Sequence, residues 1–191
     1  MTRRVALMGN PNVGKSTIFN GLTRLRQHTG NWAGVTVSCA MGQFSYGGQD
    51  FSAVDLPGIY SFDTRSAEEE LTKDFILNED YDFLLVVCDA TCLERGLYLL
   101  SQAAGLLEHR EEAGPMPQAV LCVNLCDEAE KKGIRIDFKA LERSLGIPVT
   151  PCCGRTAKGL LTLKKLLASL AASCPCACAS CSLGSPYRRL P

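Results

Sequence analysis

Residues 9 to 17 contain two glycines separated by four other residues and followed by lysine and serine, the pattern of a phosphate-binding loop. They are Gly9, Asn10, Pro11, Asn12, Val13, Gly14, Lys15, Ser16 and Thr17. Glycines let the backbone curl so that successive N–H groups point inward, and a following helix adds the positive end of its dipole. The pattern predicts a triphosphate site, in which Lys15 reaches the β- and γ-phosphates and the Ser16 hydroxyl binds Mg²⁺.

A second group, Asn124, Leu125 and Asp127, follows a run rich in Val and Leu and could read the base. An Asp carboxylate can accept hydrogen bonds from both N1–H and N2–H₂ of guanine, a pattern that adenine lacks. Asn124 and Asp127 could instead cap the next helix, since both residue types are common N-caps. Together with the phosphate-binding loop, the group favours GTP.

Two further segments could respond to the γ-phosphate. The first comprises Asp55, Leu56, Pro57 and Gly58, and the second comprises Gly34, Val35, Thr36 and Val37. Asp55 would hold Mg²⁺ through a water, Gly58 N–H would contact the γ-phosphate, and the Thr36 hydroxyl would complete the Mg²⁺ shell. Taken alone, Thr36 reads as a β-branched residue at the start of a strand. We expect the γ-phosphate to order both segments.

The residue after Gly58 is Ile59, where many GTPases carry a glutamine that orients the attacking water. An isoleucine side chain cannot do this. Hydrolysis would therefore depend on Mg²⁺, backbone N–H groups, Lys15 and a further positive charge that stabilises the transition state.

Strand and helix patterns alternate along the chain, which predicts an α/β fold with a mainly parallel sheet covered by helices on both faces. We predict six strands, at 4–9, 37–46, 51–55, 83–88, 119–124 and 148–151, and helices at 15–25, 66–77, 93–109, 138–145 and 160–172. The second and third strands are joined by the short turn 47–50, so they should form one antiparallel hairpin at the edge. Asp137 should cap the helix 138–145, and Gly146 should end it.

The composition is that of one globular domain. The chain has 191 residues, of which 46% are hydrophobic, and its formal net charge is zero, so no overall field attracts it to nucleic acid. No run of about 18 apolar residues and no signal-peptide pattern is present, so we expect a cytoplasmic polypeptide with reduced, mostly structural cysteines.

The expected domain is 1–172, and residues 173–191 are expected to form a disordered, Cys-rich tail. Four of its cysteines lie close together: Cys174, Cys176, Cys178 and Cys181. Dense thiolates can bind Zn²⁺, Cu⁺ or an iron–sulfur cluster, but this spacing matches no well-specified metal pattern. A tail without a metal is the favoured interpretation.

The motifs taken together resemble the N-terminal G domain of the ferrous iron transport protein B family. The resemblance rests on residues 9–16, 30–37, 55–61 and 124–127 and covers roughly residues 3–170. Its most discriminating part is the Asn-Trp-x-Gly-Val-Thr-Val pattern at 31–37, of which general GTPases share only the threonine. Leu125 departs from the lysine usual among GTPases, but this family places an apolar residue there.

This resemblance implies a Ras-like P-loop GTPase that binds GTP and GDP and controls Fe²⁺ uptake by a membrane permease. It also implies K⁺ stimulation, with Asn12 as the K⁺ ligand, and a final base-contacting element at Cys153, Gly154 and Arg155. The catalytic residues would be Asn12, Lys15, Thr36 and Gly58. Full-length relatives sit in the inner membrane with this domain on the cytoplasmic side, covalently linked to helical and transmembrane regions.

An alternative is a ribosome- or tRNA-associated GTPase of the Era or TrmE type, which also lacks the glutamine. Such a protein should carry an RNA-binding appendage, and the sequence shows none. We therefore expect no nucleic-acid partner.

Overall fold

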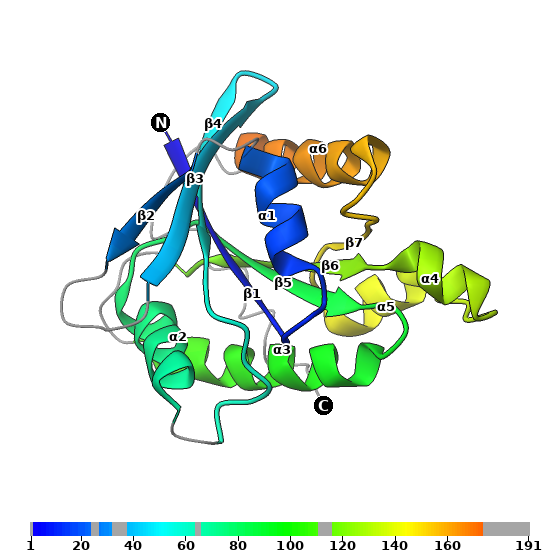
Figure 1. The fold of residues 1–191 in the computed structure, drawn as a ribbon, viewed down its shortest axis with the longest axis horizontal. Coiled ribbons are helices and arrows are strands. Elements are labelled where there is room, and N and C mark those ends of the chain that lie inside the picture. Colours follow the sequence, from blue (N-terminus) through cyan, green and yellow to red (C-terminus); the bar gives the residue numbers. More distant parts are fainter. Residues whose placement is uncertain (1, 24–26, 32–37, 64–65, 111–115, 174–191) are drawn as a thin grey trace.

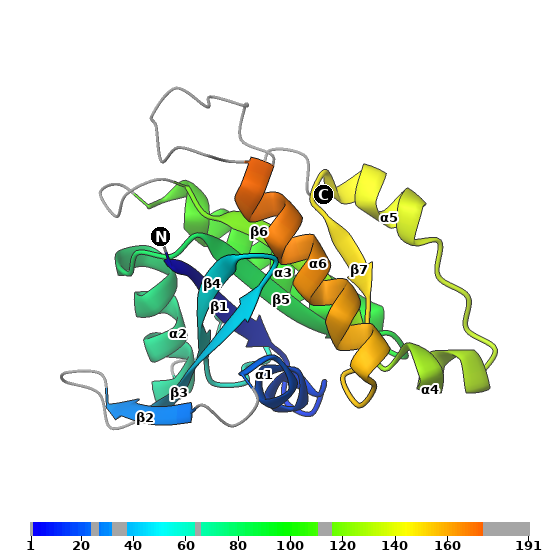
Figure 2. The same ribbon diagram turned by 90° about the horizontal axis from the view of Figure 1, so that it is seen from above.

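Seven strands form one sheet in the order β2-β3-β4-β1-β5-β6-β7 (Figures 1 and 2). The computed structural model describes residues 2–23, 27–31, 38–63, 66–110 and 116–173. Within these ranges the strands are β1 (Thr2–Gly9), β2 (Gln27–Asn31), β3 (Ser38–Tyr46), β4 (Gln49–Asp55), β5 (Phe83–Asp89), β6 (Gln118–Asn124) and β7 (Val149–Pro151).

The central part of the sheet is parallel. β1 lies between β4 and β5 and is parallel to both, and β5, β6 and β7 continue the parallel order. β3 is antiparallel to β4 and forms the predicted hairpin. The α/β fold with a mainly parallel sheet is therefore confirmed.

The structure corrects the number of strands, because β2 adds a seventh to the six predicted. It pairs antiparallel with β3, from Gln27 opposite Gly42 to Asn31 opposite Ser38. The antiparallel edge is thus three strands wide. The sequence of β2, Gln-His-Thr-Gly-Asn, contains no apolar residue, so it has no alternating pattern to reveal a strand. An edge strand can form through backbone pairing alone.

Helices cover both faces of the sheet. They are α1 (Lys15–Thr23), α2 (Ala67–Asn78), α3 (Leu93–Glu108), α4 (Cys126–Lys131), α5 (Phe138–Leu145) and α6 (Ala157–Ser173). Ile18 and Phe19 of α1 share one core with Leu163 of α6, whereas α2 and α3 pack in the core of the opposite face. Figure 1 shows these two layers above and below the sheet.

The five predicted helices are present with ends within three residues of those expected. Asp137 caps α5, since its Oδ1 accepts a hydrogen bond from Ala140 N at 2.9 Å, and Gly146 ends the helix with φ 67°. The short helix α4 was not predicted. It has six residues and one buried side chain, Ala129, so it lacks an apolar face that a sequence pattern could reveal.

The parallel strands bring the predicted motifs to one edge of the sheet. Val5, Ala6, Leu7 and Met8 in β1 are all fully buried, which fixes the strand that leads into the phosphate-binding loop. Leu7 lies opposite Asp55. The carboxyl ends of β1, β4 and β6 therefore deliver three motifs to the same edge, where open α/β sheets bind ligands.

The seven cysteines in the described part of the chain are free thiols, and Cys39, Cys88, Cys122 and Cys152 are buried. Burial raises the pKa of Cys88 to about 12, with a smaller contribution from Asp89. This supports the expectation of structural thiols. The Cys-rich segment, residues 174–191, lies outside the part of the chain that the structure describes. Among the described helices, none is long and apolar enough to span a bilayer.

Two glycines in α3 provide a test of this packing. A Cβ added to Gly96 would lie 2.1 Å from Cys88 Sγ, whereas one added to Gly105 would meet nothing within 4 Å. We expect Gly96→Ala to lower the free energy of unfolding by about 1–3 kcal/mol, because it overpacks the contact between α3 and β5. Gly105→Ala is the matched control and should raise it by about 0.5–1 kcal/mol. Urea denaturation measures both, and equal effects would contradict this account of α3.

Candidate functional site

The phosphate-binding loop turns through two residues with left-handed backbone conformation, Asn12 with φ 66° and Gly14 with φ 82°. Asparagine tolerates this region better than most residues with a side chain, and glycine adopts it freely. Gly14 also has no room for a side chain, since a Cβ would lie 2.4 Å from Asn124 Nδ2. The loop is therefore shaped partly by a residue more than a hundred positions away.

Asn124 connects the phosphate-binding loop to the loop between β7 and α6. Its Nδ2 donates to Val13 O at 2.9 Å, and its Oδ1 accepts from Gly154 N at 2.9 Å. The residue is 2% exposed. It does not cap α4, whose N-cap is Leu125 in a left-handed conformation without a side-chain hydrogen bond. The capping interpretation of Asn124 is therefore wrong.

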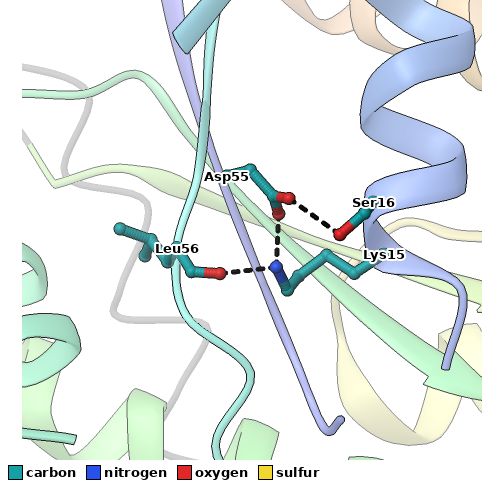
Figure 3. A network of polar contacts seen from close by, with 4 residues as sticks. All are labelled: Lys15, Ser16, Asp55 and Leu56. Carbon is teal, nitrogen blue, oxygen red and sulfur yellow. Dashed lines mark hydrogen bonds and ion pairs between the residues drawn. The ribbon is translucent and has the colours of Figure 1, made fainter. Parts of the chain in front are cut away.

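Lys15, Ser16 and Asp55 form a polar cluster between α1 and the end of β4 (Figure 3). The Lys15 ammonium group donates to Asp55 Oδ1 and to the Leu56 carbonyl, and Ser16 Oγ donates to Asp55 Oδ2 at 3.1 Å. The Lys15 and Asp55 side chains are only 9% and 11% exposed. A hydroxyl and a carboxylate facing each other are hard oxygen donors of the kind that Mg²⁺ prefers.

Asn10 joins the phosphate-binding loop to the segment after β4. Its Nδ2 donates to the carbonyls of Ile59 at 3.1 Å and Tyr60 at 3.4 Å, and Ile59 N donates to Gly9 O at 3.3 Å. A Cβ on Gly58 would lie 3.2 Å from Pro11 Cα, so the two segments are in close contact. Asn10 is predicted from its motif to bind a ligand, but no local pattern in the sequence indicates this tether.

Asp127 presents a buried oxygen without a hydrogen-bond partner among the described residues, its Oδ1. A hydrogen bond from the Cys153 thiol is the largest cause that lowers the pKa of Asp127, and the backbone N–H groups of Asp127 and Glu128 lower it further. The carboxylate is therefore ionised at neutral pH. An ionised acceptor with a free oxygen suits a ligand edge rich in N–H donors.

A cavity of about 540 Å³ lies over the phosphate-binding loop. It is lined by Asn10, Pro11, Asn12, Gly14, Lys15, Ser16, Thr17, Gly58, Asn124, Leu125, Cys153, Gly154 and Arg155. The structure thus brings four predicted segments together around one space.

Other predicted residues lie beside this cavity or beyond the described part. Val13 and Leu56 have side chains buried in the core, at 5% and 0% exposure, and they offer their carbonyls to Asn124 and Lys15. Gly9 and Asp55 are the last residues of β1 and β4, and Pro57 lies directly before Gly58. Gly34, Val35, Thr36 and Val37 lie outside the described residues.

The chain matches the family model for ferrous iron transport protein B over residues 3–167. It is 43% identical over 164 residues to the Fe(2+) transporter FeoB of Escherichia coli strain K12, and 43% identical to that of Salmonella typhimurium. These alignments cover 84% of this chain and 20% of each relative, so the chain spans about a fifth of their length.

Solved structures of related proteins share the fold. The G domain of the T. maritima FeoB iron transporter is 38% identical, with a TM-score of 0.77 and coverage of 90% of this chain and 99% of that one. The G domain of FeoB from Methanococcus jannaschii gives 38% identity, a TM-score of 0.74 and coverage of 91% and 99%. The T. maritima FeoB cytosolic domain in a GDP form is 37% identical, with a TM-score of 0.81 and coverage of 92% of this chain and 66% of that one. These relatives give no support to the alternative of an RNA-associated GTPase.

The bridging role of Asn124 leads to a stability prediction. Asn124→Ala would leave Val13 O and Gly154 N buried without partners, so we expect the free energy of unfolding to fall by about 2–4 kcal/mol. Asn78→Ala is the control, because Asn78 bonds to Asp74 at an exposed position on α2 and its loss should cost less than about 0.5 kcal/mol. Denaturant unfolding measures both changes. A similar small loss for both variants would show that the bridge contributes little.

Proposed function

We propose, since this chain belongs to the ferrous iron transport protein B family, that it is the GTP-binding and GTP-hydrolysing regulatory domain of a ferrous iron transporter. One observation carries the nucleotide assignment. The phosphate-binding loop, the Asp55 segment and the Asn124 segment meet at one cavity, and the carboxylate of Asp127 has an oxygen without a partner in the described part of the chain. In the proposed site the loop would supply donors to the phosphates, and Asp127 would supply an acceptor to guanine.

Guanine would be held at the end of the cavity formed by Leu125 and residues 153–155. Asp127 would accept hydrogen bonds from N1–H and N2–H₂ of the base. The Asn124 side chain holds Gly154 in place through the 2.9 Å hydrogen bond, so that the backbone near the base is fixed before the ligand arrives. Preorganisation of this kind reduces the entropic cost of binding.

The phosphates would lie against the backbone N–H groups of residues 12–17, at the N-terminus of α1. Lys15 would exchange its contacts with Asp55 and Leu56 for the β- and γ-phosphates, and Gly58 N–H would donate to the γ-phosphate. Ser16, Thr36 and Asp55 would hold Mg²⁺, which when bound supplies positive charge to the β- and γ-phosphate oxygens. The facing hydroxyl and carboxylate of Ser16 and Asp55, 3.1 Å apart, fit this ion.

The side chain directly after Gly58 cannot orient the attacking water. Ile59 is apolar and 2% exposed, so it packs in the core. We propose that K⁺, with the Asn12 side chain among its ligands, supplies the positive charge that other GTPases take from an arginine. Asn12 is exposed and lines the cavity, which leaves its amide oxygen accessible to a cation.

The transporter itself is the natural partner of this domain. Relatives named Fe(2+) transporter FeoB are about five times longer than the matched part. We propose that GTP turnover here regulates a covalently linked helical and membrane-spanning permease, with residues 1–172 on the cytoplasmic side and 173–191 as a tail.

Potassium dependence tests the cation proposal. We expect GTP turnover of this chain to be about tenfold or more faster in KCl than in NaCl, since one added positive charge near the γ-phosphate strongly stabilises the transition state. Asn12→Gly removes the amide but tolerates the φ of 66°, so it should abolish the K⁺ stimulation and leave GDP affinity within about twofold.

The same phosphate-release assay contains its own controls. Stimulation that persists in Asn12→Gly would contradict the role of Asn12 while leaving the GTPase assignment intact. Absence of turnover in both salts would contradict the enzymatic function itself.

Base selection is tested at Asp127. Asp127→Asn replaces an acceptor by an amide that also donates, so we expect GTP affinity to fall by about 10- to 100-fold. Xanthosine triphosphate carries an oxygen where guanine has N2–H₂, and the variant should bind it more tightly than the unaltered chain does. Titration calorimetry with both nucleotides measures the exchange, and an unchanged preference for GTP would refute the assignment.

A further inference from the structure

The segment that follows Gly58 is held at both of its ends. At the near end, Asn10 of the phosphate-binding loop donates to the carbonyls of Ile59 and Tyr60. At the far end, α3 holds Phe62 and Asp63 through side-chain hydrogen bonds. Gly58, whose N–H would donate to the γ-phosphate, therefore lies close to one anchor and five residues before the other.

Three side chains form the far anchor, and we call Asp63, Tyr98 and Gln102 the α3 latch. Tyr98 Oη donates to Asp63 Oδ2 at 3.0 Å, and Gln102 Nε2 lies 3.0 Å from both oxygens of Asp63. Gln102 Oε1 accepts from Phe62 N at 3.1 Å, so one amide binds both backbone and side chain of the segment. The hydrogen bonds close a ring, since Gln102 Nε2 also lies 3.2 Å from Tyr98 Oη.

The helical side of the latch is fixed in position. Tyr98 and Gln102 are four residues apart, which places them on the same face of α3. The opposite face is in the core, where Leu99, Leu100 and Ala103 are at most 1% exposed. Hydrogen bonding and charge from Asp63 raise the pKa of Tyr98, so the phenol stays protonated and able to donate at neutral pH.

We propose that the α3 latch holds the segment 59–63 in the arrangement seen here and so opposes the movement of Gly58 toward the γ-phosphate. Tyr98, Gln102 and Asp63 are thus positioning residues that set the relative affinity for GTP and GDP. The inference rests on the proposed function. GDP has no γ-phosphate and leaves the segment 59–63 in its latched arrangement. GTP binds through the γ-phosphate to Gly58 N–H and has to move the segment out of that arrangement.

A latch of this kind changes a conformational equilibrium. A ligand can shift an equilibrium only by its differential affinity for the two states, so an interaction that stabilises the latched state weakens apparent GTP binding. Removal of the latch should therefore strengthen GTP binding selectively. Damage to the cavity itself would instead weaken both nucleotides.

The test compares dissociation constants of a non-hydrolysable GTP analogue and of GDP, measured by titration calorimetry on the 191-residue chain. We expect Gln102→Ala to lower the Kd of the analogue about three- to tenfold and Tyr98→Phe to lower it about twofold, because each hydrogen bond contributes modestly in an exposed setting. The Kd of GDP should stay within about twofold. Tyr98→Phe removes a single hydroxyl and keeps the ring, so folding is preserved.

Two control variants remove similar interactions away from the segment. Asn78→Ala breaks an amide–carboxylate pair on α2, and Ser45→Ala breaks a hydroxyl–carboxylate pair at 2.6 Å in the β3–β4 hairpin. Both should leave the ratio of the two dissociation constants unchanged. A double variant, Tyr98→Phe with Gln102→Ala, should differ from the sum of the single changes, because the side chains share one partner.

Three results would overturn the latch. The first is a ratio of the two dissociation constants that stays as in the unaltered chain. The second is a change in that ratio that favours GDP over the GTP analogue, and the third is an equal change in both dissociation constants. Failure of the unaltered chain to bind either nucleotide would overturn the proposed function as well, so the two failures are distinguishable.

Discussion

The buried amide of Asn124 is the interaction on which the site depends. It donates to the phosphate-binding loop at Val13 and accepts from Gly154 in the loop after β7. Both partners are backbone groups, and Asn124 is only 2% exposed. If the amide were lost, the two backbone groups could not form replacement hydrogen bonds with water. One side chain at the end of β6 thus sets the distance between the phosphate end and the base end of the cavity.

A second buried interaction, between Lys15 and Asp55, links α1 to the segment that would respond to the γ-phosphate. The two groups are largely desolvated, and a buried ion pair gains little net stability because of the desolvation cost. In the proposed site a triphosphate and Mg²⁺ would separate this pair, because Lys15 would then bind the phosphates and Asp55 would bind Mg²⁺. Ser16 and the Leu56 carbonyl satisfy the remaining hydrogen bonds in the same cluster.

Most of the fold follows from local patterns. The β1, β5 and β6 strands are continuous apolar runs, and α3 and α6 carry leucines at helical spacing, so burial alone predicts them. β2 and α4 were missed because neither has an apolar pattern; the first depends on pairing with β3, and the second follows the left-handed turn at Leu125. Elements formed by tertiary pairing leave little trace in composition.

Residue type and order alone predict the chemistry of the site: a phosphate-binding loop, an acidic residue suited to guanine, and an isoleucine directly after Gly58 where many GTPases carry a glutamine. What those residues contact depends instead on the folded chain. That Asn124 joins two loops, that Asn10 tethers the segment after Gly58, and that Tyr98 and Gln102 meet Asp63 depend on sequence separations of 30 to 111 residues. Such contacts come from strand order and helix packing, and no local pattern encodes them.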